Sequence, residues 1–191
     1  MEIRWLGEAC LEVKGKKNIL IDPNYNIEPE IEPDLILITH EHDDHIDPEK
    51  LNNFPEAEIF APYTVLDKFN ILGKTVKGGE EIAKEIQIMK CDCYGSDYSV
   101  CYFYNGLLHT ADSAQFPDPG SNVEIVFSAT FSDFYSDYEA SCEKLNPDMV
   151  IPYHYDPNDE NELEEAEGLM TRLNQKGFNT RMLSPGEKIT L

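Results

Sequence analysis

The 191 residues are enough for one domain with a substantial core, and we expect a single domain over 1–191. Apolar residues make up 41% of the chain, which excludes a disordered protein, and no apolar run is long enough to cross a bilayer. The formal charge of −22 argues against a nucleic-acid partner, because binding to phosphates needs a basic surface.

The first third of the chain is predicted to form strands and two short helices. Apolar or alternating runs separated by glycine-containing turns indicate a β-meander, and the continuous run Leu35-Ile36-Leu37-Ile38 is typical of a strand buried on both faces. Asp47 followed by Pro48 marks a helix start. The expected strands are 3–6, 10–13, 19–21, 35–38 and 57–60, and the expected helices are one that begins after Asp47 and one over 63–69.

The rest of the chain interleaves strands with helices. Asn105-Gly106 is a strong hairpin signal, and no internal repeat with a fixed period is present. The expected strands are 86–89, 98–104, 107–109, 123–127, 149–152, 180–183 and 188–191, and the expected helices are 137–145 and 162–176. This order predicts an α+β protein with two mixed β-sheets and outer helices.

The first residues and the cysteines indicate a compartment. The start, Met1 to Leu6, lacks a basic segment followed by an apolar one, so we expect no secretory leader. The five cysteines are odd in number and too sparse for a disulfide scaffold, which suits a reducing environment. Both observations predict a cytoplasmic protein.

All five histidines fall at or next to the carboxyl ends of predicted strands, where open sheets bind ligands. Three of them lie in the loop after the buried strand, as His40-x-His42-x-Asp44-His45. The two-residue spacing points His40 and His42 the same way, while Asp44 and His45 can face a second site. Imidazole and carboxylate ligands suit divalent ions, so one loop can serve two metals.

This motif resembles the signature of the metallo-β-lactamase-fold hydrolases, and residues 19–23 look like the strand and aspartate that precede it in that family. The segment 148–155 is similar to the Ile-Pro-x-His-Tyr segment of the small branch that includes L-ascorbate-6-phosphate lactonase, and Ser184-Pro185-Gly186-Glu187 also resembles that branch. The resemblance covers nearly the whole chain. It implies a four-layer αββα sandwich of two mixed sheets.

The resemblance also implies a ligand set. His40 and His42 would hold a first metal, Asp44, His45 and His154 a second, and Asp112 would bridge the two. Asp112 lies in a segment similar to the family's Gly-Asp-Thr turn, with Ala111 where glycine is usual. A turn-forming aspartate is the structural alternative for Asp112.

The sequence departs from the family where a third histidine of the first metal is expected. By spacing, Cys93 falls nearest that position, and a thiolate is a competent zinc ligand. Cys91 or Asp92 could take the place after a small register shift. The remaining alternative is ordinary strand packing, with the first metal bound weakly or not at all. Glu8 stands where the branch often has histidine, and the role of His109 stays open.

The resemblance implies a hydrolase in which a metal-bound hydroxide attacks an ester, lactone or phosphoester small molecule, with Asp44 orienting the nucleophile. Two zinc ions are expected, with a single ion, or manganese or iron, as alternatives. A catalytically degenerate member of the fold and a mononuclear-iron thiol dioxygenase are the competing functions. The oligomeric state, a homo-oligomer included, is left open. Four aromatic residues could line a pocket or pack the core, namely Tyr25, Phe116, Tyr153 and Tyr155.

Overall fold

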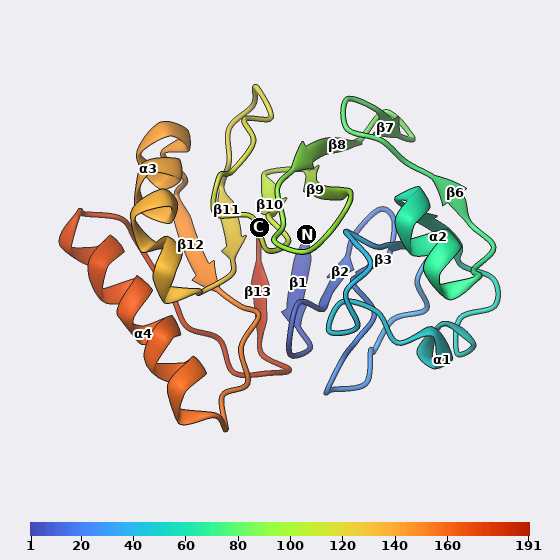
Figure 1. Cartoon of the computed structure of the whole chain (residues 1–191), viewed down its shortest axis with the longest axis horizontal. Helices are drawn as coiled ribbons and strands as arrows, with labels where there is room; N and C mark the ends of the chain where they lie inside the picture. Colours follow the sequence, from blue (N-terminus) through green and yellow to red (C-terminus); the bar gives the residue numbers. More distant parts are fainter.

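Two β-sheets stand side by side at the centre of the molecule in a computed structural model that describes residues 1–191 (Figure 1). The first sheet has seven strands, antiparallel from β13 to β3 and parallel from β3 to β6. In spatial order they are β13 (Lys188–Thr190), β1 (Glu2–Trp5), β2 (Leu11–Lys14), β3 (Ile19–Ile21), β4 (Leu35–Leu37), β5 (Glu58–Ala61) and β6 (Lys74–Thr75). The predicted meander is therefore confirmed as β1, β2 and β3.

The second sheet has six strands, and four of them run in the same direction. Strands β10, β11 and β12 pair in parallel, whereas β9 is antiparallel to both of its neighbours, so β8 runs with β10. The spatial order is β12 (Met149–Pro152), β11 (Ile125–Ser128), β10 (Leu107–His109), β9 (Ser99–Tyr104), β8 (Ile86–Cys91) and β7 (Glu81–Ile82). The carboxyl ends of β8, β10, β11 and β12 thus meet at one edge.

Helices cover the outer side of each sheet (Figure 1). The short helices α1 (Pro48–Leu51) and α2 (Tyr63–Phe69) lie on the first sheet, over a separate cluster of ten buried residues. The 3-10 helix η1 (Ser132–Phe134), α3 (Tyr135–Leu145) and α4 (Glu160–Gln175) lie on the second. A larger cluster of 39 buried residues contains side chains from both sheets, α3 and α4. The predicted α+β sandwich with helices outside is confirmed.

The first and last strands of the chain are neighbours at one edge of the first sheet. Strand β13 pairs with β1, and the Met1 amino group donates to the Leu191 carbonyl at 2.6 Å. No helix combines the length and the apolar character that crossing a membrane requires.

One predicted strand is wrong and three short elements were not expected. Residues 180–183 make only a single bridge to β12, between Thr180 and Val150. The segment pairs only at Thr180 before Leu183 enters the core, so it does not form a ladder. Strands β6 and β7 and helix η1 have two or three residues each, too few to produce a periodic pattern.

Gly78 packs against strand β8, which leads into the Cys93 segment. A Cβ at Gly78 would lie 2.5 Å from the backbone nitrogen of Lys90, a contact that cannot be relieved without moving the strand. We expect Gly78→Ala to lower the free energy of unfolding by about 1–3 kcal/mol. In the control, Gly15→Ala, the nearest atom lies 3.7 Å away, and the change should stay within about 0.5 kcal/mol. Urea unfolding measures both, and equal values for the two variants would contradict the expected clash.

Candidate metal centre

The loop after β4 is held between the two sheets. The hydroxyl of Tyr102 in β9 donates to the Ile38 carbonyl at 2.9 Å, and the backbone nitrogen of Val100 donates to the Thr39 carbonyl at 3.1 Å. The loop residues His40 and His45 are both fully buried. The carboxyl end of β4 is therefore fixed against the edge at which β8, β10 and β12 end.

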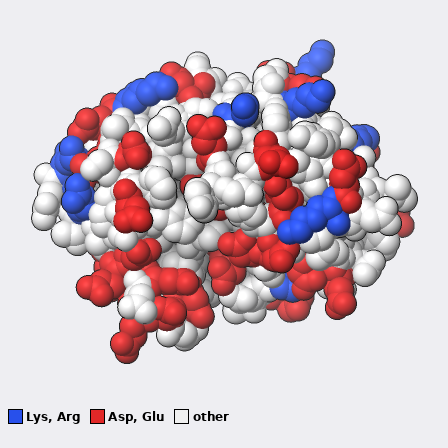
Figure 2. Space-filling model, in the orientation of Figure 1, with Lys and Arg blue, Asp and Glu red and all other residues white.

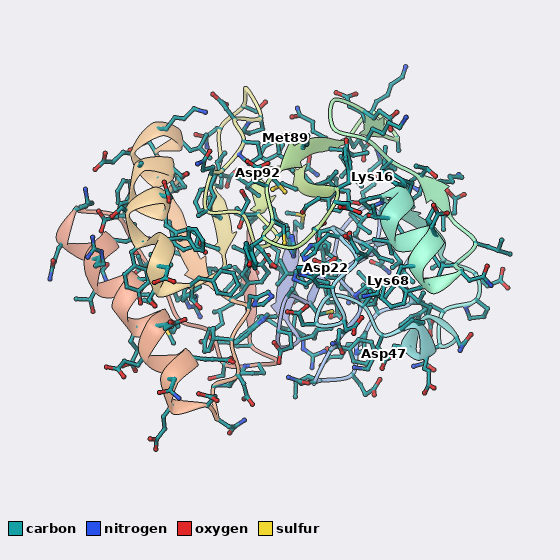
Figure 3. All side chains as sticks on the ribbon, in the orientation of Figure 1. Lys16, Asp22, Asp47, Lys68, Met89 and Asp92 are labelled. Carbon is teal, nitrogen blue, oxygen red and sulfur yellow. The ribbon has the colours of Figure 1, made fainter.

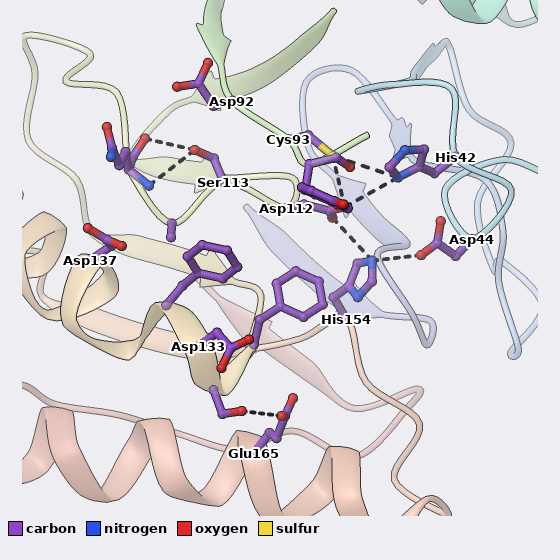
Figure 4. Close-up of a pocket in the computed structure, with 16 residues that line it drawn as sticks. His42, Asp44, Asp92, Cys93, Asp112, Ser113, Asp133, Asp137, His154 and Glu165 are labelled. Atoms are coloured by element: carbon purple, nitrogen blue, oxygen red, sulfur yellow. Dashed lines mark hydrogen bonds and ion pairs between the residues drawn. The ribbon is translucent and has the colours of Figure 1, made fainter. Parts of the chain in front are cut away.

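All seven residues predicted as ligands meet at this edge, and Figure 4 shows five of them, His42, Asp44, Cys93, Asp112 and His154. They form two groups, and within each group the candidate ligand atoms all lie within 4.8 Å of one another. The first group contains His40, His42, Cys93 and Asp112, and the second contains Asp44, His45 and His154. The division matches the one that the family resemblance implies.

Asp112 lies between the two groups, at the turn that follows β10. Its Oδ2 atom is 3.3 Å from His40 Nε2, and its Oδ1 atom is 2.8 Å from His45 Nε2 and 3.3 Å from His154 Nε2. One carboxylate thus faces imidazoles of both groups, which is the geometry needed to bridge two ions.

The donor atoms fit a metal centre better than a self-sufficient hydrogen-bond network. Asp112 Oδ1 is buried and has no hydrogen-bond partner of acceptable geometry. The Nε2 atom of His40 lies 3.1 Å from His42 Nδ1, and that of His45 lies 3.0 Å from His154 Nε2. Imidazole nitrogens and an unsatisfied carboxylate that converge in this way are the ligand types of zinc and other transition-metal ions.

Of the three candidates for the missing histidine, Cys93 is the one that lies in the first group. Its Sγ lies 3.4 Å from Asp112 Oδ2 and 3.8 Å from His42 Nδ1. The two alternatives are placed elsewhere, since the thiol of Cys91 is buried against the Ser99 hydroxyl and Asp92 is exposed outside both groups. Burial and the neighbouring Asp112 carboxylate raise the pKa of the Cys93 thiol, so in the absence of metal it is protonated.

Asp22 supports the histidines from behind and lies near the middle of the molecule (Figure 3). Its Oδ1 accepts from the Thr39 backbone nitrogen at 2.7 Å, and its Oδ2 accepts from the Thr39 hydroxyl and from His45 Nδ1, both at 2.8 Å. His40 Nδ1 lies 3.0 Å from the same hydroxyl. With both Nδ1 atoms engaged, His40 and His45 can present Nε2 to a metal. The sequence signal for Asp22 was its place at the end of β3, level with the histidine loop.

The charges in the centre are strongly coupled. Burial opposes ionisation of Asp112, but the imidazoles of His45 and His154 outweigh burial and hold its pKa well below the usual range. Burial likewise opposes protonation of His45, yet the carboxylates of Asp112 and Asp22 raise its pKa well above the ordinary value. At Asp44 burial is again the largest single effect, but the hydrogen bond with His154 and the charges of His45 and His154 together lower its pKa to about 2. The carboxylates of the centre therefore stabilise a positively charged group placed between them.

Left-handed backbone conformations gather around the centre. Glu8, Asp22, Ala111 and His154 have φ values of 46°, 48°, 51° and 60°, in a region that glycine adopts at little cost. The value at Ala111 explains why glycine is usual there. Non-glycine residues held in this region cluster at functional sites, because surrounding contacts must impose the conformation.

His109 and Glu8 lie beside the centre without joining either group. His109 is fully buried, donates from Nε2 to the Ala9 carbonyl at 3.0 Å and accepts from the Ala111 backbone nitrogen, so it supports the turn that carries Asp112. Glu8 receives the His154 backbone N–H at its carbonyl, at 3.0 Å. Burial raises the pKa of the Glu8 carboxyl group, with His154 opposing.

A cavity of about 690 Å³ opens beside the two groups and is lined by His42, Asp44, Cys93, Asp112 and His154 among others. None of the four aromatic residues that the sequence left undecided lines it, and all four are buried in the core. The aromatic residues of the wall are instead Tyr94, Phe131 and Phe134. They lie in loops and in η1, where no periodic pattern singles them out.

Known proteins share both the sequence family and the fold. A family model described as the beta-lactamase superfamily domain matches residues 2–154. A UPF0173 metal-dependent hydrolase from Thermococcus onnurineus is 42% identical, over 81% of this chain and 84% of the relative. A metallo hydrolase from the hyperthermophilic archaeon Ignicoccus hospitalis superposes with a TM-score of 0.76 at 18% identity, covering 100% of this chain and 97% of that one. A metallo-beta-lactamase fold protein from Bacillus subtilis covers 98% of both chains with a TM-score of 0.68 at 13% identity.

Proposed function

Because this chain belongs to the beta-lactamase superfamily and to its UPF0173 metal-dependent hydrolases, we propose that it hydrolyses esters or lactones of small molecules in the cavity beside the histidine cluster. The observation that carries the proposal is the pair of ligand groups joined by Asp112 at the floor of that cavity. Catalytic sites of metal hydrolases need ligands on one side and open space for substrate on the other.

Two zinc ions are the proposed occupants. His40, His42 and Cys93 would hold one, Asp44, His45 and His154 the other, and Asp112 would contact both. Bound there, zinc supplies Lewis acidity and lowers the pKa of a coordinated water towards 7. The Cys93 thiolate favours zinc over manganese, which prefers oxygen and nitrogen ligands, so manganese and iron are secondary choices.

The chain's own residues position the reacting groups. The Asp44 carboxylate is ionised at neutral pH, borders the cavity and lies 3.3 Å from His154 Nε2, so it can accept a proton from the attacking water. Water adds to the carbonyl carbon, the carbon–oxygen bond to the alcohol breaks, and the proton passes to the departing alkoxide.

Among the three substrate classes implied by the resemblance, the cavity favours carboxylic esters and lactones over phosphoesters. None of its 16 lining residues is lysine or arginine, the side chains that usually bind phosphate oxygens outside a metal site. A phosphoester would have to rely on the metal ions alone.

We expect zinc-loaded protein to hydrolyse some members of a panel of aryl esters, lactones and phosphodiesters. His42→Ala should lower kcat/KM at least about 100-fold, the upper end of the loss when an outer-shell partner of a metal ligand is removed. Asp43→Ala is the control, because Asp43 is an exposed neighbour that pairs only with Lys68. Elemental analysis accompanies the assay. Equal activity of wild type and His42→Ala would refute the proposal, and stoichiometric iron would point to a dioxygenase.

A further inference from the structure

The wall of the cavity that faces the candidate metal centre is acidic. Asp133 and Asp137, from η1 and the first turn of α3, lie across the cavity from His42 and Asp44 (Figure 4). Glu165 of α4 and Asp92 after β8 add two more carboxylates. The lining contains no lysine or arginine to balance them, and its two histidines, His42 and His154, belong to the candidate metal centre.

On the side of α3 and α4 away from the cavity, the carboxylates of α3 form ion pairs. There, Glu139 pairs with Arg172 and Glu143 pairs with Lys176 at 2.7 Å. Asp133 and Asp137 form no ion pair, although Arg172 and Lys176 lie close enough to pair with other carboxylates of α3. The surface of the molecule is acidic in general, most densely over the lower end of α4 (Figure 2). What distinguishes Asp133 and Asp137 is that they line the cavity beside the candidate metal centre without an ion-pair partner.

Two aromatic rings border the same wall. Phe131 lies edge-on to the His154 ring, with centroids 5.4 Å apart, and Phe134 is 42% exposed. Both line the cavity, on either side of Asp133 in the sequence. Aromatic faces beside carboxylates are the side chains that proteins use to hold amines and quaternary ammonium groups.

The same cavity is bordered by Asp112, the carboxylate that is the proposed shared ligand of the metal centre. The side chain of Asp112 is 10% exposed, and its Oδ1 lacks a hydrogen bond. Metal ions at the centre would offset the charges of Asp112, Asp44 and Cys93. They would leave the carboxylates of the far wall without a counter-charge.

We propose that the cavity selects substrates that carry a positively charged group, an ester or lactone of an amino or quaternary-ammonium compound, and that Asp133 and Asp137 bind that group beside Phe131 and Phe134. The inference rests on the proposed function, because it assigns the substrate class of that hydrolysis. Asp133 and Asp137 are specificity residues and take no part in bond breaking.

The test compares three acetate esters on zinc-loaded protein: 2-(trimethylammonio)ethyl acetate, its uncharged isostere 3,3-dimethylbutyl acetate, and 2-sulfoethyl acetate. We expect wild type to favour the cationic ester over the neutral one by about tenfold in kcat/KM, the sum of a cation–π contact and a screened ion pair. The preference should shrink as ionic strength rises. In Asp133→Asn/Asp137→Asn it should fall to about one, with the neutral ester unaffected. The control is Glu143→Gln/Glu164→Gln, which removes the same charge at two exposed positions of α3 and α4 that do not line the cavity, and it should keep the preference.

Equal rates on the cationic and neutral esters in wild type would overturn the inference and leave the hydrolase standing. So would a double variant that loses thermal stability but keeps its charge preference, because the aspartates would then serve only the helix N-terminus. If no ester is hydrolysed, a binding measurement tests this inference independently of the proposed hydrolase function. Calorimetry with benzyltrimethylammonium should show binding that weakens about tenfold in the Asp133→Asn/Asp137→Asn protein, and no binding to wild type overturns the inference.

Discussion

Asp112→Ala is expected to abolish hydrolysis and to remove both metal ions together. Asp112 is the one side chain whose carboxylate oxygens face imidazoles of both groups, at 2.8–3.3 Å. Without it, His40 and His45 remain in place, but the two ions lose their shared anionic ligand. We expect kcat/KM to fall about 10⁴-fold, equivalent to about 5 kcal/mol of transition-state stabilisation. Elemental analysis should show fewer than one zinc per chain.

The control for this variant is Asp118→Ala. Asp118 is exposed, lies after the same turn, and accepts a hydrogen bond only from the Gly120 backbone N–H. The substitution therefore removes an equal charge without changing either ligand group. Its activity and zinc content should match wild type. Two zinc ions retained by Asp112→Ala would show that Asp112 forms the turn and does not bridge.

The sequence predicted the site best where a strand pattern leads directly into residues of metal-binding type. The continuous apolar run before His40 predicted a buried strand, and the structure has β4 at Leu35–Leu37 with the histidine loop at its carboxyl end. Asp112 and His154 were expected from the family resemblance, and the structure brings them together because β10 and β12 are parallel, so the residues after them arrive at one edge. Their assignment as metal ligands remains a prediction that the metal analyses test.

Other parts of the site could not be predicted, because they depend on three-dimensional packing. Spacing placed Cys93 nearest the missing histidine, but Cys91 and Asp92 stayed open because strand ends vary by a residue or two. Strand β8 ends at Cys91 and turns it into the core, which brings Cys93 to the centre. The wall formed by Phe131 and Phe134 gave no signal, since η1 has three residues and the residues that share the cavity with it come from separate loops of the chain.

Asp22→Ala is expected to be the most destabilising single substitution around the site. Asp22 is fully buried and accepts three hydrogen bonds, from the backbone and hydroxyl of Thr39 and from His45. Alanine leaves these donors buried without an acceptor and keeps the strained φ of 48°. The expected cost is about 3–5 kcal/mol, the range for breaking a buried charged pair. In a chain of this length it lowers Tm by about 6–20 °C.

Two further variants separate the contributions at this position. Asp22→Asn tolerates the left-handed backbone and keeps an oxygen for Thr39 but loses the charge beside His45, so it should recover part of the stability while zinc affinity stays about 10–100-fold below wild type. Asp34→Ala, in which an exposed carboxylate loses one backbone partner, should cost no more than about 1 kcal/mol. Thermal unfolding of the metal-free proteins and zinc titration measure the two effects independently. If Asp22→Ala unfolds within 1 °C of wild type while binding zinc normally, the Thr39 and His45 donors are satisfied without Asp22, and the histidines owe their orientation to the β4 loop alone.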